Sequence, residues 1–179
     1  MNAPRNIQNL VLAGFMGSGK SSVGRLVAEQ LHFQFVDTDA LIEKRAGKYI
    51  SDIFEQDGEP AFRKLEREVV AELNGEERMV VSTGGGMIVD PANLALLKEH
   101  ALVVCLWASP ETIWERTRYS SHRPLLQEAD PQAKIRRLLA EREPFYRQAD
   151  VLVNTERRSV REVAAHVLHE FHLALRSPP

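Results

Sequence analysis

The chain has 179 residues, 44% of them hydrophobic, and this is enough for one complete core but too little for two comfortable domains. Lysine and arginine total 23 against 25 acidic residues, and the formal net charge of −2 argues against nucleic acid or an anionic membrane as a partner. There is no apolar segment typical of a signal peptide or a membrane span, and the single Cys105 cannot close an intramolecular disulfide. We therefore expect one cytoplasmic domain over residues 1–179, with small molecules as its partners. A monomer is a separate expectation, which the composition does not supply.

Short apolar runs alternate with longer stretches of helical period, which is typical of βα units wound around a parallel sheet. The runs are rich in Val, Leu, Ile and Phe, as expected for strands covered on both faces. Side-chain caps mark helix starts at Asp90, Ser109, Asp130 and Ser159, the last in a capping box with Glu162. The predicted fold class is α/β, a five-stranded parallel sheet flanked by helices, with strands at 7–13, 33–36, 79–82, 102–106 and 151–154.

Two polar stretches, 48–59 and 119–130, interrupt this alternation. The second stretch is longer than a simple connection between two helices needs, and long connections of this kind often serve as lids over a site. We therefore expect a mobile lid over about residues 117–130.

The first predicted strand runs directly into residues 14–21, GFMGSGKS, which fit the phosphate-loop pattern G-x-x-x-x-G-K-[ST]. Glycines let successive backbone N–H groups point at phosphate oxygens, and the helix that follows offers its positive N-terminal end to the same anion. Lys20 then reaches the β- and γ-phosphates, and the Ser21 hydroxyl ligates Mg²⁺. The alternative, a glycine-rich turn between strand and helix, explains neither Lys20 nor Ser21.

Two carboxylates, Asp37 and Asp39, follow the second predicted strand, at the sheet edge where ligands bind in open α/β folds. If the extended geometry continues through both, their side chains point the same way and share one pocket. One carboxylate could then hold Mg²⁺ through water while the other orients a substrate hydroxyl. The alternative for Asp39 is that it caps a helix over 40–46, and the residues alone favour neither interpretation.

Three consecutive glycines, Gly84, Gly85 and Gly86, follow the third predicted strand at the same edge. A tight turn would need only one or two glycines, whereas three remove every side chain and allow a ligand to approach the backbone closely. We interpret them as a binding loop.

Two arginines are the remaining candidates. Arg142 lies on the helical stripe that otherwise holds apolar residues, so its charge needs a carboxylate or phosphate partner, and Pro144 nearby disturbs the helix and could open space. Arg63 flanks an apolar stripe and has Glu59 and Glu66 as helical neighbours. Without further information, an ordinary surface ion pair is the preferred interpretation of Arg63.

Taken together, these motifs resemble the shikimate kinase family. GFMGSGKSSVGRLVA, FVDTDALIE, ISDIFEQDGEPAFRKLE, STGGGMI, HRPLL and EREPFYRQAD occur in that family's order and spacing, from about residue 10 to 158. The resemblance implies a single-domain P-loop fold with a lid and an acceptor-binding helical segment over about 39–73. It also implies transfer of a phosphoryl group from ATP to the 3-hydroxyl of shikimate, a step in aromatic amino acid biosynthesis.

On the nucleotide side, the resemblance implies one Mg²⁺ per subunit, ligated by Ser21 with help from Asp37 through a water molecule. Arg123, in HRPLL, resembles a lid arginine that neutralises charge in the transition state. Arg116 and Arg158 match positions near the adenine, with the adjacent Arg157 as an alternative to Arg158. The implied ATP ligands in the phosphate loop are Gly17, Ser18, Gly19, Lys20, Ser21 and Ser22.

On the acceptor side, the resemblance implies that Asp39 holds shikimate hydroxyls and acts as a base or orients the attacking hydroxyl. It implies that Arg63 and Arg142 clamp the substrate carboxylate, which reverses the preference for a surface ion pair at Arg63. Residues 84–86 line the same site, Gly85 most directly. The catalytic residues are then Lys20, Asp39 and Arg123.

Two rival functions remain. A kinase for another polyol acid such as gluconate shares the phosphate loop, but the two arginines and the glycine loop favour shikimate. A non-catalytic ligand sensor would usually lack Lys20, Asp39 or Arg123, or carry a DNA-binding segment, and the sequence shows neither sign.

Overall fold

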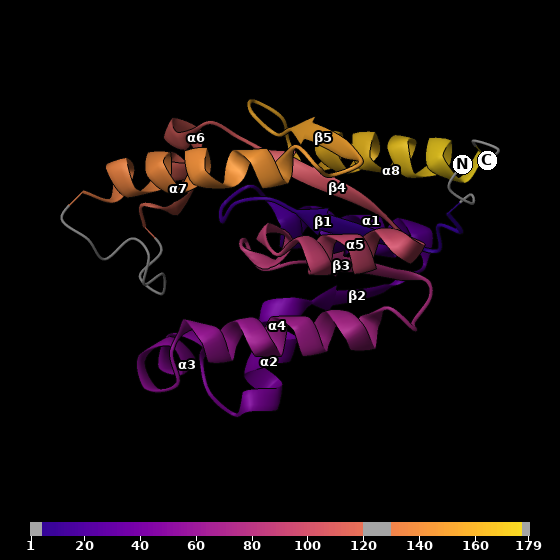
Figure 1. Cartoon of the computed structure of the whole chain (residues 1–179). Helices are drawn as coiled ribbons and strands as arrows, with labels where there is room; N and C mark the ends of the chain where they lie inside the picture. Colours follow the sequence, from indigo (N-terminus) through magenta and orange to yellow (C-terminus); the bar gives the residue numbers. More distant parts are fainter. Residues whose placement is uncertain (1–4, 120–129, 177–179) are drawn as a thin grey trace.

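A five-stranded parallel sheet lies at the centre of the computed structural model, which describes residues 5–119 and 130–176 (Figure 1). The strand order is β2-β3-β1-β4-β5, so the chain passes from β1 to the edge strand β2, returns to place β3 between them, and then crosses to the other side of β1. Val11 of β1 pairs in parallel with Val81 and with Val103. The strands are β1 (Asn9–Ala13), β2 (Gln34–Asp37), β3 (Met79–Ser82), β4 (Ala101–Trp107) and β5 (Val151–Asn154).

All five predicted strands are confirmed, with small differences at their ends. The predictions for β3 and β5 agree with the structure at both ends. β1 begins at Asn9 rather than at residue 7, and β4 is one residue longer at each end than the predicted 102–106. β2 lies one residue further along the chain and ends at Asp37. This shift places the Asp37 carboxylate at the end of a strand.

Helices cover both faces of the sheet, which confirms the predicted fold class. Side chains of β1 alternate between the faces: Leu10 and Leu12 pack with α1 and α8, and Val11 and Ala13 pack on the side of α4, α5 and α7. Within the described ranges no helix is long and apolar enough to cross a membrane. The helices are α1 (Lys20–Leu31), α2 (Thr38–Ala46), α3 (Ile50–Gln56), α4 (Glu59–Leu73), η1 (Met87–Val89), α5 (Pro91–His100), α6 (Pro110–Thr117), α7 (Pro131–Tyr146) and α8 (Val160–Arg176).

The four predicted helix starts are confirmed by their hydrogen bonds. Asp90, Ser109 and Asp130 each accept a backbone N–H two or three residues along the chain. At α8, the Ser159 hydroxyl accepts from the Glu162 N–H at 3.3 Å, and the Glu162 carboxylate accepts from the Ser159 N–H at 2.8 Å. This reciprocal pair is the capping box expected from the sequence.

Loss of this capping box is expected to destabilise the fold without touching the sheet edge that carries the predicted site. Ser159→Ala should lower the free energy of unfolding by about 1 kcal/mol, because one N-terminal N–H of α8 loses its partner. Urea denaturation checks this, with Ser159→Thr as a variant that keeps a capping hydroxyl. Identical unfolding midpoints for Ser159→Ala and the parent would contradict the assignment.

The stretch 48–59, which appears from its own residues as a polar interruption and lies within the helical segment 39–73 implied by the resemblance, contains the helix α3. Its core contact is small: Ile53 is buried, and the Phe54 ring lies 4.8 Å from the Phe62 ring of α4, measured between centroids. Ile50 also packs against the core, and three apolar residues within seven give too short a periodic signal to predict the helix from these residues alone. Most of the predicted lid, residues 120–129, lies outside the described residues.

Candidate active site

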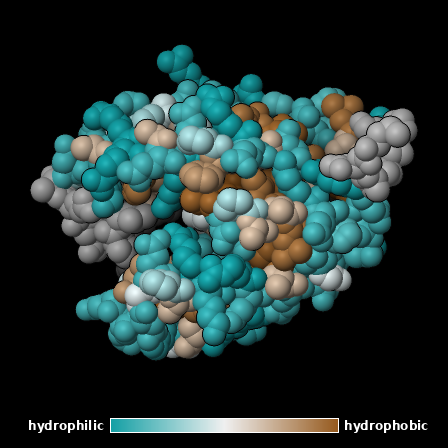
Figure 2. Space-filling view, viewed as in Figure 1, coloured by the Kyte–Doolittle hydropathy of each residue, from teal (hydrophilic) through white to brown (hydrophobic). Residues whose placement is uncertain are grey.

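Three loops meet at the carboxyl edge of the sheet. The phosphate loop follows β1, the segment Asp37–Asp39 follows β2, and the glycine loop, residues 84–86, follows β3. Since β2, β3 and β1 are neighbours in the sheet, their connections are brought together there. Figure 2 shows the surface hollowed on this side of the molecule, between the part formed by α7 and the part formed by α3 and α4, with a largely hydrophilic rim.

The phosphate loop has the backbone that its glycines predict. Gly17 has a φ of 75°, and a Cβ at this position would lie 2.6 Å from the Thr117 methyl group, so α6 packs directly against the loop. Lys20, the first residue of α1, donates from Nζ to the carbonyl oxygens of Gly14 and Phe15 at 2.8 and 2.9 Å. The ammonium group therefore lies over the loop, and Ser18 adds a buried hydroxyl beside it.

Ser21 and Asp37 lie together, as the predicted Mg²⁺ site requires. The Ser21 hydroxyl donates to Asp37 Oδ2 at 2.9 Å, and Ser82 Oγ lies 3.3 Å from Ser21 Oγ. A hydroxyl beside a carboxylate is an all-oxygen donor set of the kind that Mg²⁺ prefers, usually completed by waters and substrate phosphates. The residues present therefore fit this ion.

The helix after β2 is capped by Asp37, not by Asp39 as the alternative interpretation of the sequence had it. Asp37 Oδ1 accepts from the backbone N–H groups of Asp39 and Ala40, so Asp37 caps α2 and Asp39 does not. The expectation that Asp37 and Asp39 share an extended geometry is also wrong, because the strand ends at Asp37 and the helix begins at Thr38. Asp39 therefore lies in the first turn of α2 without capping it, which leaves its carboxylate available for another role.

Asp39 carries a carboxylate with an unusual environment. Its Oδ1 is buried and forms no hydrogen bond with the described residues. Burial and the negative charge of Asp37 raise the pKa of Asp39 to about 6, with Glu66 adding to the rise and the Lys20 ammonium opposing it. A Cβ on Gly84 would lie 2.5 Å from Asp39 Oδ1, so the carboxylate abuts the glycine loop. Such a group is a base poised close to neutral pH.

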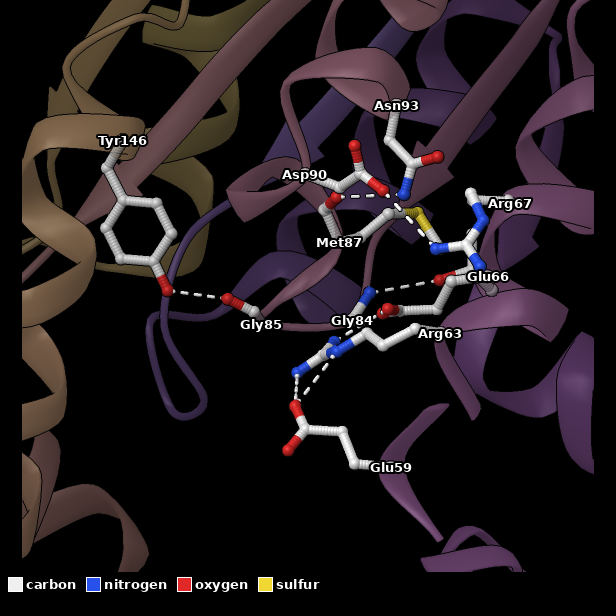
Figure 3. Close-up of polar contacts among 11 residues, drawn as sticks. Glu59, Arg63, Glu66, Arg67, Gly84, Gly85, Met87, Asp90, Asn93 and Tyr146 are labelled. Carbon is white, nitrogen blue, oxygen red and sulfur yellow. Dashed lines mark hydrogen bonds and ion pairs between the residues drawn. The ribbon is translucent and has the colours of Figure 1, made fainter. Parts of the chain in front are cut away.

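Arg63 is both an ion-paired residue and a neighbour of the glycine loop. Its guanidinium donates to Glu66 at 2.6 Å and to Glu59 at 2.8 Å, as Figure 3 shows. A Cβ on Gly86 would lie 2.7 Å from Arg63 Nη1. The ion pair expected from helical spacing is therefore present. The Arg63 side chain is only 27% exposed, and the ion pair holds its guanidinium beside the glycine loop rather than on the open surface.

Glu66 is a residue of the site that the sequence analysis missed. It is 1% exposed, its Oε2 accepts from Arg63, and its Oε1 is buried without a hydrogen bond to the described residues. Burial raises the pKa of Glu66, and the hydrogen bond and charge of Arg63 offset this only in part. Its position between Phe62 and Val69 on the apolar stripe of α4 was a usable signal, of the same kind that identified Arg142.

Arg142 approaches the glycine loop from the opposite side. It is half-buried on α7, its Cζ lies 5.6 Å from the centroid of the Phe15 ring, and its Nη1 would lie 3.5 Å from a Cβ on Gly85. Within residues 5–119 and 130–176, no carboxylate forms an ion pair with it. The helix continues through Pro144. A half-buried guanidinium of this kind is suited to an anionic ligand.

The arginines predicted near the adenine lie around the phosphate loop and the connection after β5. Arg116 donates to the Thr155 carbonyl oxygen at 2.8 Å and to the Gly17 carbonyl oxygen at 3.3 Å, so it joins these two segments. Arg158 lies 3.1 Å from His166 Nδ1, and the adjacent Arg157 has a φ of 53°. Ser22 is exposed in the first turn of α1, and Arg123 lies outside the described residues.

Comparison with known proteins gives one consistent result. The family model described as "Shikimate kinase" matches residues 16–172. The chain is 44% identical to the shikimate kinase of Caldanaerobacter subterraneus, over 92% of this chain and 96% of that protein, and 46% identical to that of Thermus thermophilus, over 95% and 93%. The structure of shikimate kinase from Acinetobacter baumannii in complex with shikimate matches with a TM-score of 0.89 and 38% identity, covering 96% of both chains.

Proposed function

The chain belongs to the shikimate kinase family, and from this premise we propose how its own residues phosphorylate shikimate. The reaction transfers the γ-phosphoryl group of ATP to the 3-hydroxyl of shikimate and gives shikimate 3-phosphate and ADP. The observation that carries the proposal is the meeting of a phosphate loop with a carboxylate and two arginines at one glycine loop. This arrangement offers a donor and an acceptor position side by side.

The phosphate loop and its surroundings hold ATP. Backbone N–H groups and the start of α1 face the phosphates, and the Lys20 ammonium neutralises charge on them. Ser21 and Asp37 would hold one Mg²⁺ per subunit, and this ion would neutralise charge on the phosphate oxygens. Arg116 and Arg158 contact the adenine side of the nucleotide. The loop ligands are Gly17, Ser18, Gly19, Lys20, Ser21 and Ser22.

The acceptor lies between α4 and α7. Arg63 and Arg142 reach the glycine loop from opposite sides and clamp the substrate carboxylate, because two guanidinium groups fix both its position and its orientation. Asp39 accepts a hydrogen bond from the attacking hydroxyl, orients it and takes its proton. The backbone of residues 84–86 borders the same site. Phosphoryl transfer depends chiefly on such positioning and on charge neutralisation.

Replacement of Arg142 is expected to weaken shikimate binding selectively. Arg142→Leu should raise the KM for shikimate roughly 10- to 100-fold, as expected for loss of a hydrogen bond to a charged group, and leave the KM for Mg-ATP nearly unchanged. Steady-state kinetics with each substrate varied in turn measures this. Arg147→Leu is the matched control, since Arg147 lies on the same chain segment but is 67% exposed and paired with Glu143. Equal shikimate KM values in Arg142→Leu and the control would remove Arg142 from the acceptor site.

The segment of about residues 117–130 closes over the site and carries Arg123 to the transferring phosphoryl group. Exclusion of water by this lid favours transfer to shikimate over ATP hydrolysis. The chain acts as one cytoplasmic, monomeric domain, with residues 39–73 forming the acceptor-binding helical segment.

The test of the function is acceptor-dependent ADP release. Purified protein with Mg-ATP is assayed with shikimate, with gluconate and with no acceptor, and the product is identified by mass. We expect release with shikimate alone, together with a phosphorylated shikimate. Release with gluconate would favour a different polyol-acid kinase, and tight shikimate binding without ADP release would favour a non-catalytic sensor.

A further inference from the structure

The glycine loop is held by two hydroxyl groups from different helices. On one side, the Gly84 N–H donates to Thr38 Oγ1 at 3.0 Å, and Thr38 is fully buried in the first turn of α2. On the other side, the Tyr146 hydroxyl at the end of α7 donates to the Gly85 carbonyl oxygen at 2.6 Å, as Figure 3 shows. Two successive residues of the loop are thus fixed to α2 and to α7. Backbone hydrogen bonds add to this anchoring, because the Gly84 carbonyl oxygen accepts from the Met87 N–H at 3.2 Å and the Gly86 carbonyl oxygen accepts from the Val89 N–H at 3.0 Å.

Each hydroxyl lies next to a residue of the acceptor site. Thr38 precedes Asp39 in the chain, and Tyr146 follows Arg142 by one helical turn on the same face of α7. Burial raises the pKa of Tyr146 to about 12, against the charge of Arg142 and its hydrogen bond to the tyrosine. The hydroxyl therefore stays protonated and donates to Gly85.

The loop also contacts the donor side of the site. A Cβ on Gly85 would lie 3.6 Å from both the Gly14 carbonyl oxygen and the Met16 nitrogen, so the glycine loop and the phosphate loop pack backbone against backbone. Asp39 adjoins the loop at Gly84 and Arg63 adjoins it at Gly86. The position of this loop therefore sets the separation between the donor phosphate and the acceptor groups.

We propose that Thr38 and Tyr146 are positioning residues that fix the glycine loop, and through it the distance and orientation of shikimate relative to the phosphate loop. The proposal rests on the function proposed above and adds two residues to it. Neither side chain needs to touch the reacting atoms, because each acts through the backbone of Gly84 or Gly85 and through its neighbour Asp39 or Arg142. A misplacement of about 1 Å at this position suffices to reduce productive binding.

Removal of either hydroxyl alone tests the proposal. Tyr146→Phe and Thr38→Val keep the size of the side chain and delete its hydrogen bond to the loop. We expect each to weaken shikimate binding and raise its KM roughly fivefold to tenfold, the effect of about one net hydrogen bond, with the KM for Mg-ATP within about twofold of the parent value. Thr38→Ser, which keeps a hydroxyl, should restore parental values. Shikimate affinity is measured calorimetrically without nucleotide, and both KM values by steady-state kinetics.

One control separates positioning from general loss of stability. Asn9→Ala deletes buried hydrogen bonds at the amino-terminal end of β1, far from the site, and it should lower the melting temperature without altering shikimate affinity.

Unchanged shikimate affinity in both hydroxyl-deleting variants would overturn the proposal. Equal increases in the KM values of the two substrates would overturn it too, because a loosened fold, rather than a misplaced loop, would explain them. The activity of the parent protein distinguishes failure of the proposed function from failure of the positioning role. If the parent lacks shikimate-dependent ADP release, the function fails, whereas a parent that is active beside unaffected variants refutes only the positioning role.

Discussion

Asp39→Asn is expected to lower turnover with Mg-ATP and shikimate by roughly 10²- to 10⁴-fold, the range in which a positioned general base contributes. Asparagine keeps the shape of the side chain but cannot take up the proton of the attacking hydroxyl. The burial that raises the pKa of Asp39 to about 6 makes its carboxylate a stronger base than an exposed aspartate while leaving it ionised at neutral pH. The side chain also abuts the glycine loop, where the acceptor would bind.

The raised pKa of Asp39 gives this prediction a pH signature. Catalysis needs the deprotonated carboxylate, so kcat/KM for shikimate should fall about tenfold per pH unit below pH 6 in the parent, and this limb should be missing from the residual activity of Asp39→Asn. The stability of the fold changes in the opposite direction and falls as pH rises. At pH values between the ordinary pKa of aspartate, 3.8, and about 6, the folded state binds the Asp39 proton more tightly than the unfolded state does, and this contribution is lost as the proton leaves.

Activity and stability can therefore be separated in one variant. At pH 8 the melting temperature of Asp39→Asn should be no lower than that of the parent, although its turnover is far lower. Asp57→Asn is the matched control, because it makes the same chemical change in an exposed carboxylate that pairs with Lys48. Turnover of Asp39→Asn within tenfold of the parent would leave Asp39 without a role as base.

Lys20→Met is expected to lower turnover by roughly 10²- to 10³-fold, as does loss of one preorganised group that stabilises charge in a transition state. The ammonium lies over the phosphate loop, held by the Gly14 and Phe15 carbonyl oxygens, and in the proposed function it acts where charge develops on the transferred group. Rapid-quench measurement of one turnover checks the chemical step directly. Lys64→Met, at a position 74% exposed, is the control, and a chemical step of parental rate in Lys20→Met would falsify the assignment.

The fold was predictable because its strands are buried on both faces and its helices begin at caps. A parallel strand covered by helices reads as a continuous apolar run, and such runs located all five strands within two residues at each end. A helix start depends on a side-chain oxygen placed just before the first turn. Because this is a local feature, it can be predicted from the sequence. The helix α3 was not predictable in this way, because its apolar contacts come from Ile50, Ile53 and Phe54 alone and span little more than one turn.

The candidate site was predictable where a motif or a charge out of place marks it. Arg142 stands out because a cation interrupts an apolar stripe, and Glu66 interrupts the stripe of α4 in the same way. Thr38 and Tyr146 carry no such mark. A threonine at a helix start and a tyrosine on an apolar stripe fit their surroundings as ordinary residues, and only the three-dimensional contact with the glycine loop distinguishes them. Asp37 rather than Asp39 caps α2, and this too depends on where the strand ends.

The contact between Gly85 and the phosphate loop has a thermodynamic consequence. Because Gly14, Met16 and Gly85 pack without intervening side chains, displacement of one loop by its ligand changes the space available to the other. In the proposed function this contact offers a route for coupling between nucleotide and acceptor binding, and such coupling is reciprocal. Whatever factor a bound nucleotide adds to shikimate affinity, bound shikimate adds the same factor to nucleotide affinity.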